Sequence, residues 1–248
     1  MIEKNKKNIE IIVVIPVYNE GKSIYDLLCN INKVGVRNLA LIIINDKSTD
    51  DSLDWINKFK NDNKGICLQV ISHEDNLGLG GALNTGLTYC LKNYNFNILF
   101  TMDGDNTHDP SLIPNMINEI NSGKDIVIAS RYRPGAKVSG IPRHRIFLSY
   151  CARICYSIFW NLKGVRDYTC LFRAHTKSIL DMAFPNKDEV ILKEKDFLVT
   201  TEILRVIMKS GGVAFEVPIR INYSNKIEVS NMKIFKTIIR TFKVLLFK

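Results

Sequence analysis

The sequence lacks several features that would place it in a class at once. Its 248 residues contain no apolar run approaching about 18 residues, so we expect no helix that spans a bilayer. The opening stretch MIEKNKKNIE is polar and charged, unlike a secretory signal. None of the six cysteines forms a CxxC pair, which argues against zinc and favours reduced thiols in a cytoplasmic protein.

Acidic residues are almost absent from one segment. Between Arg131 and Arg173 the chain has nine Lys or Arg residues and one acid, Asp167, and this segment carries +8 of the formal net charge of +9. A solvated surface usually mixes both signs, so we expect the segment to face an anion. Seven of the nine are Arg, whose planar guanidinium suits phosphate.

Two phosphate-binding motifs are incomplete. PVYNEGKS ends like a Walker A loop but has Pro16 in place of its first glycine, and GLGGALNTG lacks the full spacing of a dinucleotide fingerprint. The glycines around Gly80 still predict a close approach of the backbone to a ligand. They also open a helix, whose N-terminal amides favour phosphate.

Strand and helix signals alternate through the first half of the chain. Continuous β-branched runs predict buried strands, and apolar residues at helical spacing predict the helices between them. We therefore expect an α/β fold, with a mostly parallel sheet covered by helices on both faces. The predicted strands are 9–18, 39–46, 66–73, 96–105, 125–133 and 213–223, and the predicted helices are 21–34, 48–61, 80–94, 110–123, 145–162 and 197–212. Residues 167–175 are predicted as a loop and short strand.

Polar side chains gather where these strands end. In a parallel sheet, ligands bind beyond the carboxyl ends of the strands. The residues at those ends are Tyr18, Glu20, Asp46, Asp103, Asp105, Ser130 and Arg131. In TMDGDNTHDP, Asp103 and Asp105 are one residue apart and can share Mg²⁺ or Mn²⁺, which prefer oxygen ligands. The alternative is a plain turn, in which Asp is common.

Six motifs together resemble glycosyltransferase family 2. They are VVIPVYNE, NDKSTDDS, NLGLGGALNTGL, TMDGDNTHDP, IASRYRPG and DYTCLFRA, in the family's order and spacing over about residues 9–222. The chain is most similar to dolichol-phosphate mannosyltransferases and other polyprenyl-phosphate sugar transferases. The resemblance implies a GT-A fold, a nucleotide-sugar donor, Mg²⁺ or Mn²⁺, and inversion at the anomeric carbon.

The resemblance also implies roles for individual residues. Donor binding falls to Pro16, Tyr18, Glu20, Asp46, Gly80, Asp103 and Asp105, and metal binding to Asp103, Asp105 and Thr107. Acceptor binding falls to Arg131, Arg145, Ser149 and Arg173, and the catalytic group comprises Asp105, Arg131 and Glu202. For Glu202, a capping or ion-pair role is the alternative. Two positions depart from the family: Thr107 where relatives can have Gln, and Leu171 where they have glycine.

The chain divides into one domain and a tail. We expect a single GT-A domain over 1–222, with a nucleotide-sugar half over about 9–130 and an acceptor half over 131–222. The segment 223–248 has apolar residues at helical spacing and a basic opposite row. It is predicted to be an amphipathic helix, either on an anionic membrane surface or docked on the domain.

The predicted function is transfer of a sugar from GDP-mannose or a UDP-hexose to a polyprenyl or dolichyl phosphate. We expect the protein to act peripherally, at the inner face of the cell membrane. A phosphate monoester is largely dianionic at neutral pH and needs no general base. Two alternatives stay open: transfer to a hydroxyl of a glycan, lipid or protein, and a nucleotide-sugar-binding module without turnover. Nucleic-acid binding is disfavoured, because no recognisable module is present.

Overall fold

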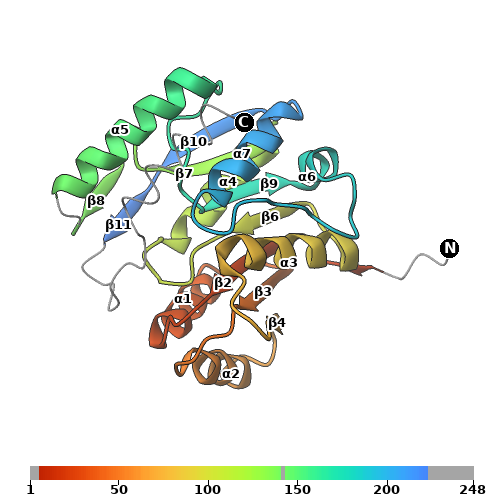
Figure 1. The fold of residues 1–248 in the computed structure, drawn as a ribbon. Helices are drawn as coiled ribbons and strands as arrows, with labels where there is room; N and C mark the ends of the chain where they lie inside the picture. The colour runs from red at the N-terminus through yellow and green to blue at the C-terminus, as the bar shows by residue number, and fades with distance from the viewer. Residues whose placement is uncertain (1–5, 141–142, 223–248) are drawn as a thin grey trace.

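The computed structural model describes residues 6–140 and 143–222, with the backbone alone for 143–145 and 222. Its centre is a seven-stranded sheet (Figure 1). The strand order is β10 (Ala214–Pro218), β7 (Ile126–Ser130), β9 (Arg173–Thr176), β6 (Ile98–Thr101), β2 (Ile11–Val17), β3 (Leu39–Asn45) and β4 (Cys67–Ser72). Every pairing is parallel except those of β9, which runs antiparallel to β6 and β7. The predicted α/β fold with a mostly parallel sheet is therefore confirmed.

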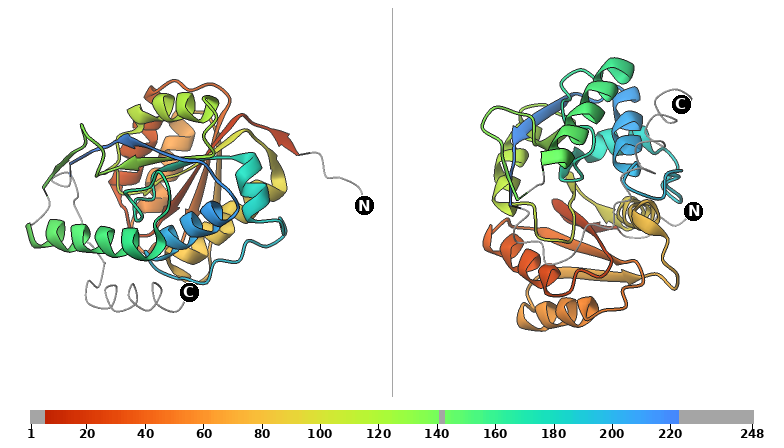
Figure 2. Two further views of the ribbon diagram at one scale, coloured as in Figure 1. Left: turned by 90° about the horizontal axis from the view of Figure 1, so that it is seen from above. Right: turned by 60° about the vertical axis from the view of Figure 1, so that its left-hand side comes forward.

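Helices cover both faces of this sheet, as the view from above shows (Figure 2). In chain order they are α1 (Lys22–Lys33), α2 (Ser52–Asp62), α3 (Gly78–Asn93), the short η1 (Pro110–Leu112), α4 (Ile113–Asn121), α5 (Arg143–Trp160), α6 (Lys177–Ala183) and α7 (Val199–Lys209). Two small parallel ribbons complete the fold. They pair β1 (Lys7–Asn8) with β5 (Tyr94–Asn95), and β8 (Lys137–Ser139) with β11 (Arg220–Asn222).

The central strand β2 shows why these residues form a buried sheet. All seven of its residues are buried, and six are Ile or Val, which suit a strand packed on both faces. Pro16 has no N–H to donate, yet it lies in this strand. The structure accommodates it because the ladder with β6 ends at the pair Val14–Thr101, two residues before the proline.

Several features differ from the sequence-based expectation, among them the short strands β1, β5 and β8, which were not predicted. The strand predicted over 213–223 is split at Ile219 into β10 and β11, which belong to different sheets. The short helix α6 was not predicted. The segment 167–175 contains β9 as expected, but its insertion between β6 and β7 as the one antiparallel strand of the sheet has no local signal. The predicted amphipathic helix over 223–248 lies outside the described residues.

A glycine allows α3 to pack closely on the sheet. A Cβ atom added at Gly86 would lie 2.5 Å from Val14 Cγ1 and 3.3 Å from Ile44 Cγ1. Both contacts are closer than carbon atoms normally approach. Gly86 therefore sets the distance between α3 and the strands β2 and β3.

We expect Gly86→Ala to lower the free energy of unfolding by about 1–3 kcal/mol, because the added methyl overpacks this interface. The measurement is urea unfolding followed by circular dichroism. Gly65→Ala is the matched control, since a Cβ there meets nothing within 4 Å. Equal stability of the two variants would contradict the close helix–sheet contact.

Candidate active site

The loops after β2, β3 and β6 meet at one edge of the sheet. These strands are neighbours and run parallel, so Tyr18–Glu20, Asp46 and Asp103–Asp105 follow their carboxyl ends together. A Cβ added at Gly104 would lie 3.0 Å from the carbonyl oxygen of Pro16. The glycine between the two aspartates therefore lets their loop pack against the loop that follows β2.

Each aspartate of the Asp-Gly-Asp loop has a protein partner. Asp105 Oδ1 accepts hydrogen bonds from the Thr107 hydroxyl at 2.6 Å and the Thr107 N–H at 3.1 Å. Asp103 Oδ2 lies 3.6 Å from Nδ1 of the buried His108. Thr107 thus holds the carboxylate of Asp105 in one orientation, and its own role as a metal ligand stays a prediction.

The donor set fits a hard divalent cation. Asp103 and Asp105 are only partly buried and offer carboxylate oxygens at one sheet edge. Within residues 6–140 and 143–222, no three His, Cys, Asp or Glu side chains form a group that could hold a metal ion. Two carboxylates suit Mg²⁺ or Mn²⁺, which are commonly bound by one or two carboxylates together with substrate phosphates.

Asp46 occupies the N-terminus of α3. Its buried carboxylate accepts hydrogen bonds from the N–H groups of Leu77 and Gly78, both at 2.8 Å. Oδ1 also lies 2.7 Å from Nδ1 of His73, whose Nε2 is 2.9 Å from the Thr85 hydroxyl. The helix amides that the glycine-rich sequence suggested for phosphate therefore bind this aspartate. The donor contact of Asp46 stays a prediction.

The close approach that Gly80 permits is made by the chain itself. A Cβ added at Gly80 would lie 1.9 Å from the carbonyl oxygen of Glu194, and the Gly80 N–H donates to Lys195 at 3.1 Å. We call residues 190–196, which run along α3, the strap. The space that we predicted for a donor phosphate at Gly80 is filled by the strap, because a glycine without Cβ admits any backbone.

Glu202 of α7 fastens the strap from the other side. Its carboxylate accepts hydrogen bonds from the N–H groups of Lys193 at 3.0 Å and Glu194 at 2.9 Å. Two backbone donors therefore occupy the group that we considered as a general base. The geometry agrees with the capping alternative.

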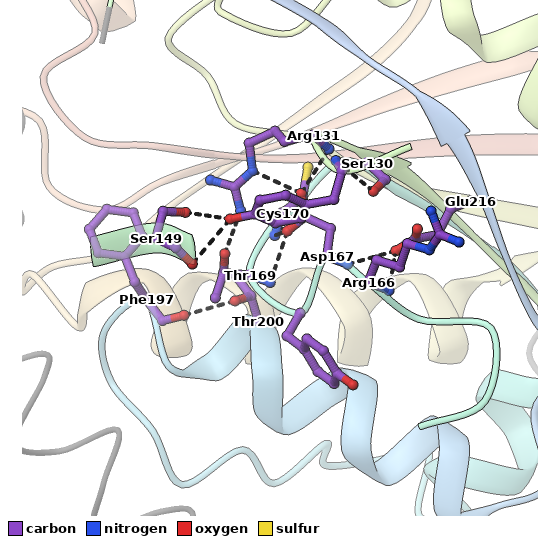
Figure 3. A network of polar contacts seen from close by, with 12 residues as sticks. Ser130, Arg131, Ser149, Arg166, Asp167, Thr169, Cys170, Phe197, Thr200 and Glu216 are labelled. Carbon is purple, nitrogen blue, oxygen red and sulfur yellow. Dashed lines mark hydrogen bonds and ion pairs between the residues drawn. The ribbon is translucent and has the colours of Figure 1, made fainter. Parts of the chain in front are cut away.

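Arg131 is bound to Asp167 in a two-point ion pair (Figure 3). Its Nε donates to Oδ2 at 2.8 Å and its Nη2 to Oδ1 at 2.6 Å. Asp167 is fully buried and also accepts from the backbone N–H of Arg131 and of Cys170. Glu216 in β10 accepts from the N–H groups of Arg166 and Asp167, both at 2.6 Å.

The charges of this pair stabilise each other. Burial raises the pKa of Asp167, but the neighbouring Arg131 charge and its hydrogen bonds outweigh this and lower the pKa to about 2. Burial likewise lowers the pKa of Arg131, whereas the Asp167 carboxylate raises it well above its ordinary value. Arg131 is therefore held in place by the protein, and its contact with a phosphate stays a prediction.

Arg173, which we predicted to contact the acceptor, is enclosed in the core. Its side chain is 1% exposed, and its guanidinium donates to the carbonyl oxygens of Thr200 at 2.5 Å and Tyr168 at 2.8 Å. Burial lowers its pKa to about 10. Arg173 lies on β9 and braces the segments on either side of that strand from inside the core.

The remaining residues that we predicted to bind the acceptor, Arg145 and Ser149, lie on α5. The Ser149 hydroxyl is 2.6 Å from the Tyr132 hydroxyl, and Arg153 lies 5.0 Å above the Tyr132 ring. This places Ser149 close to the loop that carries Arg131. Arg145 is on the same helix, but its side chain lies outside the described residues.

Sequence reasoning missed two of the residues that organise this site. Asp167 was noted only as the one acid in a basic segment, and that isolation was the signal for a buried ion pair. Glu216 gave no signal, because its backbone partners are about fifty residues away in the chain. His73, to which we gave no role from the sequence, contacts Asp46.

Comparison with solved structures defines the fold class. The chain is similar to glucosyl-3-phosphoglycerate synthase from Mycobacterium tuberculosis, crystallised with Mn²⁺, UDP and glucosyl-3-phosphoglycerate, with a TM-score of 0.63 and 18% identity. The match covers 95% of this chain and 79% of that one. The fold is the GT-A fold.

The chain belongs to glycosyl transferase family 2, whose profile matches residues 12–183, and is a glycosyltransferase. It is 25% identical to polyprenol monophosphomannose synthase of Mycolicibacterium smegmatis over 208 residues, 84% of this chain and 76% of the relative. It is 28% identical to dolichol-phosphate mannosyltransferase of Pyrococcus furiosus over 191 residues, 74% of this chain and 52% of that protein. The family resemblance seen in the six motifs is thereby confirmed.

We expect Asp167 to contribute a pH-dependent part of the stability. Its pKa is about 2 in the folded protein and about 3.9 when unfolded, so the ion pair stabilises fully above about pH 4. The contribution, about 2 kcal/mol, is lost as the pH falls toward 2. Asp167→Asn should therefore destabilise by about 3–5 kcal/mol near neutral pH and by less in acid.

Urea unfolding of wild type and Asp167→Asn across this pH range measures the difference. Asp54→Asn removes an exposed carboxylate in α2 and serves as the control. A stability difference that is the same at both ends of the range would contradict the assignment.

Proposed function

We propose that this glycosyltransferase moves a sugar from GDP-mannose or a UDP-hexose to a polyprenyl phosphate, with inversion at the anomeric carbon. The observation that carries the proposal is the Asp-Gly-Asp loop. It lies beside the loop after β2, at the carboxyl edge of a GT-A sheet, in a chain similar to polyprenyl-phosphate mannosyltransferases.

Asp103 and Asp105 are the residues that would hold Mg²⁺ or Mn²⁺. A bound cation of this kind neutralises charge on the leaving diphosphate as a Lewis acid. The solved neighbour that contains Mn²⁺ and UDP supports this assignment by its similar fold. In this chain, Thr107 fixes the orientation of Asp105, and His108 lies against Asp103.

The donor nucleotide is proposed to lie over the loop after β2. Tyr18 is exposed there, and Glu20 follows it at the same sheet edge. Asp46 and His73 position the neighbouring start of α3 through the contacts already described. Their role in donor binding is thus to hold the loop that forms the wall of the site.

A phosphate acceptor agrees with the chemistry of these residues. The dianion of a phosphate monoester is itself a nucleophile, so no side chain has to remove a proton. Glu202, the candidate base for a hydroxyl acceptor, is occupied by two strap N–H groups. The basic segment 131–173 supplies positive charge near Ser149 on α5.

The surface of α5 supports delivery of the acceptor from a membrane. The described part of the chain has no helix that could cross a membrane. On α5, however, several large apolar side chains face solvent, including Phe147 at 65% and Ile158 at 71% exposure. We propose that this face meets the lipid surface, with Arg153 beside it for anionic headgroups.

Metal-dependent transfer by Asp105→Asn should fall by a factor on the order of 100 or more, because the cation that stabilises the leaving group is no longer held. The assay uses GDP-mannose, UDP-glucose and UDP-GlcNAc with polyprenyl phosphate, with and without Mn²⁺. Asp54→Asn is the control and should keep full activity. The proposal fails if sugar reaches a saccharide or polyprenol but not polyprenyl phosphate.

Glu202→Gln distinguishes a structural role of Glu202, which binds the strap, from a role as general base. We expect it to lower the free energy of unfolding by about 1–2 kcal/mol, since one carboxylate oxygen becomes a donor that faces strap N–H groups. Transfer to polyprenyl phosphate should retain its pH profile. A turnover loss on the order of 100-fold at unchanged stability would instead identify Glu202 as the base.

A further inference from the structure

We infer a second anion site, for a phosphate monoester, on the far side of the Asp-Gly-Asp loop. A cavity of about 730 Å³ lies between the end of α1, the segment 106–111 and the β8–β11 ribbon. Its lining includes Lys33, Lys137 and Arg220, but not Asp103 or Asp105. The cavity is thus separate from the proposed metal site and goes beyond the proposed function.

The ribbon places two cations side by side. Lys137 in β8 and Arg220 in β11 are paired residues in the parallel register. Like charges facing each other across paired strands repel, which destabilises a ribbon of only three residue pairs. Neither side chain forms an ion pair with any other described residue, so nothing in that part of the chain offsets the repulsion. An anion bound between Lys137 and Arg220 would offset this repulsion.

The opposite wall adds a third cation. Lys33, in the last turn of α1, lines the same cavity and also has no ion pair within the described ranges. The one carboxylate among the described lining residues is Asp109, whose Oδ1 accepts the N–H of Ser111 at 2.9 Å. Three cations against one carboxylate leave a charge of +2, which matches the dianion of a phosphate monoester.

The size and the polar lining point to a small ligand. Pockets for small molecules have volumes of about 300–1,000 Å³, and this cavity lies within that range. Arg220 offers a planar fork for phosphate oxygens, and Lys33 and Lys137 offer point charges. Ser111 and Asn106 line the same space with further polar groups.

The cavity shares a wall with the Asp-Gly-Asp loop. Thr107 and His108 line it, while Thr107 bonds to Asp105 and His108 lies against Asp103. His108 also forms a β-bridge with Ile221 of β11, next to Arg220. A ligand in the cavity would therefore contact Thr107 and His108, which orient Asp105 and Asp103.

The test is calorimetric titration with glycerol 3-phosphate in buffer freed of divalent cations. We expect wild type to bind it, and Lys137→Gln/Arg220→Gln to bind at least about tenfold more weakly, because charge-assisted hydrogen bonds are lost. Lys60→Gln/Lys64→Gln removes two exposed charges from the α2 region and should bind like wild type. Asp105→Asn keeps all three cations of the cavity and should still bind glycerol 3-phosphate, so binding here does not depend on the proposed transfer reaction.

A second arm separates a soluble phosphate from a lipid headgroup. Vesicles of phosphatidylcholine, with and without phosphatidic acid, are sedimented with wild type and both double variants. If Lys137→Gln/Arg220→Gln loses glycerol 3-phosphate binding but still sediments with phosphatidic acid like wild type, the result supports a soluble ligand. A loss of phosphatidic acid-dependent sedimentation that is specific to Lys137→Gln/Arg220→Gln supports a lipid one. Equal behaviour of the two double variants with both probes overturns the inference.

The melting temperature of Lys137→Gln/Arg220→Gln gives an independent readout. Removing two facing cations should leave the melting temperature of Lys137→Gln/Arg220→Gln unchanged or higher than that of wild type without ligand. Glycerol 3-phosphate should raise the melting temperature of wild type and of Lys60→Gln/Lys64→Gln, but not that of the pocket variant. A rise of equal size in all three proteins would show unspecific charge screening and overturn the site.

Discussion

The buried carboxylate of Asp167 is the contact on which the second half of the described chain depends. It binds Arg131 at the end of β7 and the N–H of Cys170, just before β9. Its own N–H, with that of Arg166, is bound by Glu216 of β10. Three neighbouring strands are therefore joined at one point by ionic and backbone contacts. Because the pair is buried, losing either charge would leave the other without a partner.

The sequence was sufficient where the signal is local. The β-branched runs that became β2, β3 and β7 identified the parallel core, since such strands are apolar on both faces. The strand ends placed Tyr18, Asp46 and Asp103 at one edge of the sheet, which the structure confirms. The spacing of the aspartates also indicated the loop now found beside the end of β2.

Sequence reasoning failed where a residue's partner is distant in the chain. Arg173 looked like one more phosphate-binding arginine, but its carbonyl acceptors enclose it in the core. Gly80 looked like a phosphate loop, but the strap arrives from more than a hundred residues away. Neither outcome follows from local pattern, because a guanidinium can donate to a carbonyl oxygen as well as to a phosphate, and a glycine admits any backbone segment that lies close by. The antiparallel insertion of β9 belongs to the same class of long-range events.

The occupied start of α3 has a consequence for substrate affinity. Many nucleotide-binding folds use the positive end of a helix to attract diphosphate. In this enzyme the carboxylate of Asp46 already neutralises that end. Under the proposed function, the counter-charge for a sugar nucleotide would therefore come from side chains and from the cation proposed at Asp103 and Asp105, and donor affinity would rise with the concentration of that cation.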